Sequence, residues 1–251
     1  MKIMNSVYIL FLSVLLINVG LFSAYSQETK SKNEVPLELN YKVNVGIFHV
    51  GEGRLTVGKK TSYCDYAFDG EIWTTGLARV ISKIHYHFRS CINKKTGWPS
   101  EAMRYGLKGK DESFEYVKFD HYSLPDSTIF YGFNNDTVTL CKNVYDLMSG
   151  LHHLYIDYDP DNFYKGQEIL IMTYWKDQIY DMRIIYEGIE TIKTKKGDVR
   201  CHKYMPVTEI GNFFKTNRDV SIWVTDDEAY LPIRIIIDLK VGTLTGDLIE
   251  E

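Results

Sequence analysis

The stretch NVYDLMSGLHHLYIDYD at residues 143–159 decides the fold class of this chain. Its apolar residues recur at steps of three and four, as on one face of an amphipathic helix; they are Val144, Leu147, Met148, Leu151, Leu154 and Tyr155. Asn143 is a favourable N-cap, and Pro160 ends the helix near Asp159 because proline disfavours helical geometry in the residue before it. The sequence therefore predicts one helix over about residues 143–159.

The chain on both sides of this helix is typical of β-strands. Residues 37–45 alternate between apolar and polar side chains, as in a strand with one face in water. Asp69-Gly70 is a turn signal that predicts the end of a strand over 63–68. Residues 169–175 are apolar on both faces and predict a central strand under the helix. Because a helix with one apolar face needs a sheet to pack against, we expect a mainly β protein. Its architecture would be a curved antiparallel sheet, or an open barrel or sandwich, wrapped around the one helix.

The N-terminal 26 residues have the order of a secretory signal peptide. A lone lysine precedes an apolar run over 7–22, and Ala24 and Ser26 stand at the positions that signal peptidase recognises. We expect cleavage near Ser26, which leaves a single exported β-rich domain over 27–251 that is periplasmic, or otherwise exported, and soluble. The alternative is a retained transmembrane anchor, since the run approaches the ~20 apolar residues that span a bilayer.

Composition and motifs exclude several function classes. The chain has 29 Lys and Arg against 33 Asp and Glu, a net charge of −4, and so offers no broad basic surface for nucleic acid. It contains no nucleophile elbow, zinc-protease helix motif, phosphate loop or dinucleotide-binding glycine motif. We therefore assign no catalytic residue and no cofactor, and favour a protein that is not an enzyme.

The chain has four cysteines, at positions 64, 91, 141 and 201. An even number in an exported chain permits disulfides, with three possible pairings. Their spacing matches no zinc motif, and a domain of this size is stable without disulfides. The sequence slightly favours four small buried cysteines over disulfide bonds, and it does not select one of the three pairings.

His85 and His87 stand two apart on a predicted strand, so both side chains point to one face, as in half of a zinc or copper site. An outward polar face is the favoured interpretation, because the sequence shows no third ligand. Trp175, Trp223, Asp226 and Asp227 are the other weak binding candidates. A place in the core is favoured for the tryptophans, and a hairpin turn for the acidic pair.

The segment over 157–168, DYDPDNFYKGQE, is the nearest match to a metal-binding motif. Four carboxylates stand at the first, third, fifth and twelfth positions of a calcium loop: Asp157, Asp159, Asp161 and Glu168. Asn162 replaces the glycine of the turn, Pro160 lies inside the loop, and a strand follows where a helix is expected. A helix end followed by a polar turn is therefore favoured over a metal site.

Several short motifs follow one another in a definite order over nearly the whole chain after residue 26. They comprise Tyr41, Gly46, Gly51, Tyr145-Asp146-Leu147, Gly166, Gly197, Cys201, Pro206, Trp223, Thr225, Asp226, Asp227 and Pro232. Their order resembles an uncharacterised family of exported bacterial proteins with a YmcC-like fold. Gly53 stands where that family has alanine. The resemblance implies a mostly antiparallel β fold with a helix, in the bacterial envelope, and it implies no activity, substrate or catalytic residue.

Three hypotheses for the function follow. The favoured one is a non-enzymatic periplasmic or cell-envelope binding or assembly protein that holds a lipid, a glycan or a protein partner. The second is an envelope hydrolase whose carboxylates and histidines meet in a cleft with a shifted pKa. The third is a structural adaptor that pairs through an exposed sheet edge.

Overall fold

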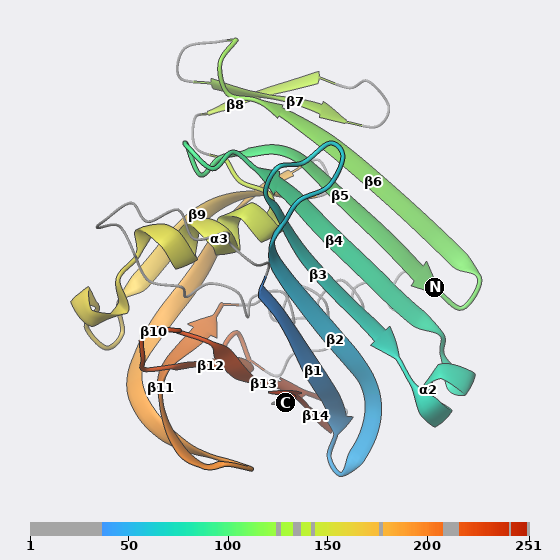
Figure 1. The fold of residues 1–251 in the computed structure, drawn as a ribbon, viewed down its shortest axis with the longest axis vertical. Helices are drawn as coiled ribbons and strands as arrows, with labels where there is room; N and C mark the ends of the chain where they lie inside the picture. The colour runs from blue at the N-terminus through green and yellow to red at the C-terminus, as the bar shows by residue number, and fades with distance from the viewer. Residues whose placement is uncertain are drawn as a thin grey trace.

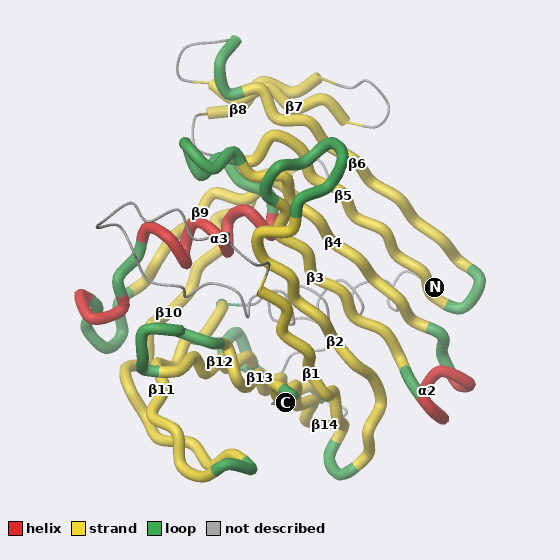
Figure 2. The backbone as a smooth tube through the Cα atoms, in the orientation of Figure 1, coloured by secondary structure: helices red, strands yellow, loops and turns green. Residues whose placement is uncertain are grey.

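The computed structural model describes residues 37–123, 127–132, 137–141, 144–175, 178–207, 216–240 and 242–249. The predicted signal peptide and its cleavage site near Ser26 lie outside these residues, as does Asn143. The described chain is almost entirely strand, with few helical segments (Figure 2). No helix in this part of the chain is long and apolar enough to cross a membrane. The prediction of a mainly β protein is confirmed.

The described strands form one 14-stranded sheet in the order β8-β7-β6-β5-β4-β3-β2-β1-β14-β13-β12-β11-β10-β9 (Figure 1). The first eight are β1 (Leu37–Val45), β2 (Phe48–Lys59), β3 (Ala67–Thr74), β4 (Ile84–Ile92), β5 (Pro99–Lys108), β6 (Asp111–Asp120), β7 (Ser127–Gly132) and β8 (Thr137–Cys141). The other six are β9 (Glu168–Trp175), β10 (Gln178–Thr194), β11 (Gly197–Pro206), β12 (Val220–Thr225), β13 (Pro232–Leu239) and β14 (Gly242–Leu248).

The sheet consists of two antiparallel meanders. Strands β1 to β8 form one meander and β9 to β14 the other, and β1 joins them by pairing with β14, with Tyr41 opposite Leu248. In the described residues β8 and β9 are the two edges, so the sheet is curled but not closed. The predicted curved antiparallel sheet is thus observed in its open form.

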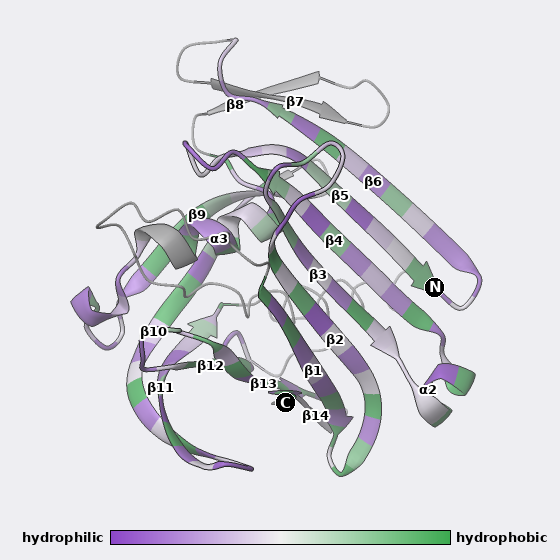
Figure 3. Cartoon of the chain, in the orientation of Figure 1, coloured by the Kyte–Doolittle hydropathy of each residue, from purple (hydrophilic) through white to green (hydrophobic). Residues whose placement is uncertain are grey.

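Alternation along the strands places apolar side chains on the concave face. In β1, which has the bounds predicted from the sequence, Leu39, Tyr41 and Val43 are buried between more exposed neighbours. The same alternation of hydrophobic and hydrophilic residues runs along β2 to β6 (Figure 3). This two-residue period is the pattern of a sheet with one face packed against the core and the other exposed to solvent.

The predicted helix is α3 (Leu147–Asp157), and it fills the concave side of the curl. Its apolar residues Leu151 and Leu154 pack in one core with Phe68 of β3 and Ile171 of β9. The helix begins four residues after the predicted N-cap Asn143, because Asp146 caps it instead. Two further helical segments are the short α2 (Gly76–Ile81) and the 3-10 helix η2 (Pro160–Asn162).

Two local predictions were wrong. The apolar run over 169–175 is the edge strand β9, not a central strand; Ile169 and Ile171 are buried in the core with α3, whereas Leu170 is 55% exposed. Asp69 and Gly70 lie inside β3 and do not end a strand, because the Asp69 carboxylate is held by side chains of β4.

The structure also pairs two of the four cysteines, where the sequence favoured none. Cys64 and Cys91 form a disulfide with their Cα atoms 5.5 Å apart, within the usual range for this bond. Cys201 is a free thiol buried in the core. The disulfide fixes the segment before β3 to the end of β4.

Candidate functional site

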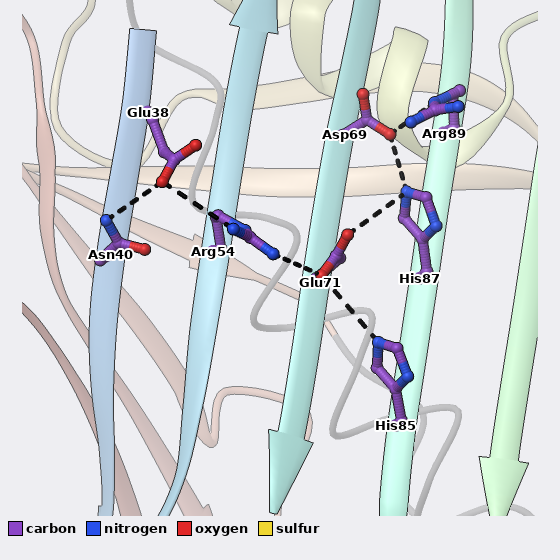
Figure 4. A network of polar contacts seen from close by, with 8 residues as sticks. All are labelled: Glu38, Asn40, Arg54, Asp69, Glu71, His85, His87 and Arg89. Carbon is purple, nitrogen blue, oxygen red and sulfur yellow. Dashed lines mark hydrogen bonds and ion pairs between the residues drawn. The ribbon is translucent and has the colours of Figure 1, made fainter.

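A row of charged side chains crosses β1 to β4 on the face opposite α3 (Figure 4). At the β4 end of the row, Asp69 Oδ1 accepts hydrogen bonds from His87 Nε2 at 2.7 Å and from Arg89 Nε at 2.6 Å. The predicted pair His85 and His87 does share this face of β4. His87 is the one that meets a carboxylate at hydrogen-bond distance.

The rest of this row is also balanced by opposite charges. Glu71 lies 3.0 Å from Arg54 and 3.9 Å from His85, and Arg54 lies 3.9 Å from Glu38. The hydrogen bond to Glu71 raises the pKa of Arg54, whereas burial lowers the pKa of His85. Opposite charges on adjacent strands stabilise a sheet. The row is therefore a cross-strand network of ion pairs, in line with the favoured interpretation of His85 and His87 as part of a polar face.

A second feature is a group of exposed apolar side chains at one end of the sheet, which we call the apolar rim. It consists of Ile47 in the β1–β2 turn, Phe48 at the start of β2, and Leu77, Val80 and Ile81 in α2. Each of these five side chains is between 70 and 91% exposed. Both segments lie at the same end of the sheet (Figure 1). Large apolar side chains gathered in this way on a surface mark an interaction site.

Hydrogen bonds hold the two segments of the apolar rim together. The backbone N–H of Thr75 donates to Val50 O at 3.1 Å, and the Thr75 hydroxyl lies 3.1 Å from His49 Nε2. Exposed basic residues flank the apolar side chains, with Arg79 inside α2 and Lys83 just after it. No acidic residue lies between Thr75 and Lys83.

The third feature is a cluster of three metal-capable side chains, Asp161, His202 and Asp226. Their potential ligand atoms all lie within 4.8 Å of one another, and this is the one such group in the described part of the chain. Asp161 comes from η2, His202 from β11, and Asp226 from the end of β12. We call it the Asp161–His202–Asp226 cluster. It unites an acidic residue of the calcium-like segment with one from the predicted hairpin.

Tyrosines surround the histidine of this cluster. His202 is fully buried, and its Nδ1 lies 2.8 Å from the Tyr186 hydroxyl. The Tyr230 ring stacks on the imidazole with their centroids 5.7 Å apart. Burial lowers the pKa of His202, against the opposing effect of Asp226. Burial thus favours the neutral imidazole over the charged one, and the neutral form is the one that can bind a metal ion.

The other carboxylates of the calcium-like segment have different partners. Asp159 caps η2, where Oδ1 accepts from the backbone of Asp161 and Oδ2 accepts from Asn162. Glu168 lies 3.5 Å from Arg183 on the neighbouring strand. The side chain of Asp157 lies outside the described residues. A twelve-residue calcium loop therefore stays the less favoured of the two interpretations of this segment.

The remaining sequence candidates occupy structural positions. Trp223 is buried, and its indole N–H donates to Glu190 while Lys203 Nζ sits 4.9 Å from the ring centroid. Asp227 accepts hydrogen bonds from Thr225, Ala229 and Tyr230 and so holds the turn after β12. The side chain of Trp175 lies outside the described residues.

Sequence reasoning missed His202 and the apolar rim for different reasons. His202 is one polar residue in an alternating strand, and no motif distinguishes it. The rim left a signal, because the large apolar residue Ile47 follows Gly46 in a turn, where polar residues are usual, and Phe48 comes directly after it.

Comparison with known proteins gives a family and a fold. The model of the family described as "Protein of unknown function (DUF3108)" matches residues 40–249, which agrees with the resemblance to an uncharacterised family. The fold is similar to a crystal structure of a β-barrel-like DUF1849 protein from Brucella abortus, with a TM-score of 0.57 and 7% identity over 86% of this chain and 96% of that one. A DUF1089 family protein from Pseudomonas aeruginosa matches with a TM-score of 0.33 and 8% identity over 84% and 94%. No curated protein sequence matches this chain.

Proposed function

This chain belongs to the DUF3108 family, and we propose that it is a non-enzymatic binding protein of the cell envelope that docks on a lipid surface. The observation that carries this proposal is the apolar rim. Its five large side chains are exposed to water around the β1–β2 turn and on α2, at one end of an otherwise alternating sheet.

The physical case rests on hydration and charge. Moving a side chain of this size fully out of water contributes roughly 1.5–3 kcal/mol, and even partial burial of several such groups holds a protein at an interface. The side chains project from a turn and a short helix, so they can enter a lipid surface without any change in the sheet. Arg79 and Lys83 stand where they would meet anionic lipid headgroups.

The compartment is supported by two independent features. The disulfide between Cys64 and Cys91 is of a kind that persists in oxidising compartments outside the cytosol. The first 26 residues have the pattern of a signal peptide. An exported protein of this kind would find lipid surfaces within reach.

The sheet-edge hypothesis is less well supported. Part of the β9 edge is covered, because the Tyr145 N–H donates to Met172 O at 3.0 Å and the Tyr174 N–H donates to Tyr145 O at 2.7 Å. The other described edge, β8, is only five residues long. Short and covered edges are the usual protection against strand addition.

Vesicle flotation tests the proposal. The chain is mixed with vesicles of phosphatidylethanolamine and phosphatidylglycerol, and the bound fraction is compared with that of a Val80→Glu/Ile81→Glu variant. Both residues are exposed, so the variant should fold normally. Leu170→Glu is the matched control, since Leu170 is an exposed apolar residue on β9.

We expect the double variant to bind at least about tenfold more weakly, and the Leu170→Glu control to bind within about twofold of the wild type. Absence of wild-type binding, or equal binding by the double variant, would refute lipid docking. A wild-type dimer that the double variant converts to a monomer would also refute it, because the apolar rim would then be a self-association surface.

A further inference from the structure

We propose that the Asp161–His202–Asp226 cluster binds one divalent transition-metal ion of the zinc type. This inference is independent of lipid docking and goes beyond it. The cluster offers one imidazole nitrogen and two carboxylate oxygens from three separate segments of the chain. Three protein ligands of this kind leave further coordination positions for water or another small ligand.

The donor set selects the class of ion. Carboxylate oxygens alone suit calcium or magnesium, whereas an imidazole together with carboxylates suits zinc and related ions. Ligands at zinc distances in a tetrahedral site lie about 3.4 Å apart. The ligand atoms here are within 4.8 Å of one another, and His202 Nε2 is 2.9 Å from Asp226 Oδ1. Small side-chain movements would therefore complete the coordination.

A second observation points to a ligand at this place. His202 Nε2 is fully buried and is paired with Asp226 Oδ1 at 2.9 Å, although the geometry of this contact does not meet the criteria for a hydrogen bond. The hydroxyl of Tyr204, a buried residue two positions further along β11, also has no hydrogen-bond partner in the described part of the chain. Leaving a buried polar atom such as the Tyr204 hydroxyl without a hydrogen bond costs about 1–3 kcal/mol. An ion bound between His202 Nε2 and Asp226 would replace their poorly aligned contact with direct coordination.

The surroundings of the histidine match those of a metal ligand. A metal-binding imidazole usually directs its other nitrogen to an oxygen atom, which fixes the tautomer and the ring orientation. His202 Nδ1 is 2.8 Å from the Tyr186 hydroxyl, which leaves Nε2 for the ion. Asp161 is exposed, so an ion can enter from the solvent on that side.

Arg200 provides the competing explanation. Its Nε pairs with Asp226 Oδ2, while Asp226 Oδ1 is the oxygen that faces His202. A hydrogen-bonded row of Tyr186, His202 and Asp226 could serve the fold alone, and Asp161 would then have no part in it. The role of Asp161 therefore separates the two explanations.

Metal titration of the full chain provides the test. The protein is purified without a polyhistidine tag, treated with a chelator, and titrated with zinc by calorimetry, with metal content measured by mass spectrometry. Asp161→Asn is the main variant, because Asp161 is exposed and its replacement should not disturb folding. Asp198→Asn is the matched control, an exposed aspartate on the same strand as His202.

We expect one zinc ion per chain, at least about tenfold weaker binding for Asp161→Asn, and binding within about twofold of the wild type for Asp198→Asn. Substitution with cobalt should give visible absorption that Asp161→Asn weakens. The proposal is overturned if the wild type retains no zinc, or if Asp161→Asn binds zinc as the wild type does. Tighter binding of calcium than of zinc would also overturn it, since the imidazole would then not be a ligand.

Discussion

Replacing Asp146 with alanine should destabilise the protein by about 3 kcal/mol. Asp146 Oδ1 accepts from the backbone N–H of Met148 at 2.9 Å and of Ser149 at 3.3 Å, and Oδ2 accepts from the hydroxyls of Ser90 at 2.7 Å and Ser149 at 2.6 Å. Loss of an N-cap costs roughly 0.5–2 kcal/mol. The Ser90 hydroxyl is fully buried, and without its acceptor it costs about 1–3 kcal/mol more.

Urea and thermal unfolding, followed by circular dichroism, measure this cost. For a chain of this length, 3 kcal/mol lowers the melting temperature by about 6–12 °C. Asp146→Asn is the control, because its Oδ1 can still accept from the helix N-terminus and its amide can donate to the serine oxygens. The free energy of unfolding of this control should be less than about 1 kcal/mol below that of the wild type. If Asp146→Ala stays within about 0.5 kcal/mol of the wild type, the carboxylate does not anchor α3 and the reasoning is wrong.

The same carboxylate gives a dependence on pH. Burial raises the pKa of Asp146 above 3.8, while its hydrogen bonds from Ser149 and Ser90 act in the opposite direction. The folded state therefore binds this proton more tightly than the unfolded state, so its contribution to stability falls as the pH rises from about 3.8 through the folded pKa. Relative to Asp146→Asn, the wild type should lose stability as the pH rises above about 4. If the wild type instead gained stability relative to Asp146→Asn as the pH rises, the pKa of Asp146 would not be raised in the folded state and the reasoning would be wrong.

Three further substitutions test the packing of the sheet. The Cys64→Ser/Cys91→Ser double variant should lose about 3.5 kcal/mol in urea unfolding, since the bond closes a loop with a sequence separation of 27; an unchanged midpoint would mean that the cysteines are not paired. Leu151→Ala removes a fully buried side chain of α3 and should cost about 2–5 kcal/mol in thermal unfolding. Gly51→Ala would place a Cβ atom 2.6 Å from the backbone oxygen of Trp73, so β2 and β3 must shift at a cost of about 1–3 kcal/mol; wild-type stability would show that the strands are not so close.

Local patterns were enough to predict the class of fold, but not every boundary. The apolar face of α3 follows from the steps between Leu147, Leu151 and Leu154, because a helix repeats every 3.6 residues. Its start was misplaced at Asn143, although Asp146 and Ser149 form a capping box that the sequence displays. Asn143 and Asp146 are both good capping residues, and Asp146 is distinguished by its capping box with Ser149 and by its tertiary contact with Ser90.

Pairing between distant segments could not be predicted from local patterns. Tyr41 of β1 pairs opposite Leu248 of β14, and the sequence of neither strand indicates that the other is its partner. The interpretation of Asp69-Gly70 as a turn failed for the same reason, because its partners His87 and Arg89 come from the next strand. Tertiary hydrogen bonds of this kind override the turn preference of a dipeptide.

The two proposed sites illustrate what a single sequence can reveal. The apolar rim breaks a local rule, since Ile47 in the β1–β2 turn and Phe48 directly after it are both apolar and exposed, and a violation of this kind is visible without a structure. The Asp161–His202–Asp226 cluster breaks none, because each member is ordinary in its own segment and only the curl of the sheet brings them together. The rim lies on the β1–β2 turn and α2, and the cluster on η2, β11 and the end of β12. Since the apolar rim and the Asp161–His202–Asp226 cluster share no element, a substitution in one site leaves the other intact. Each proposal is therefore tested by its own experiment.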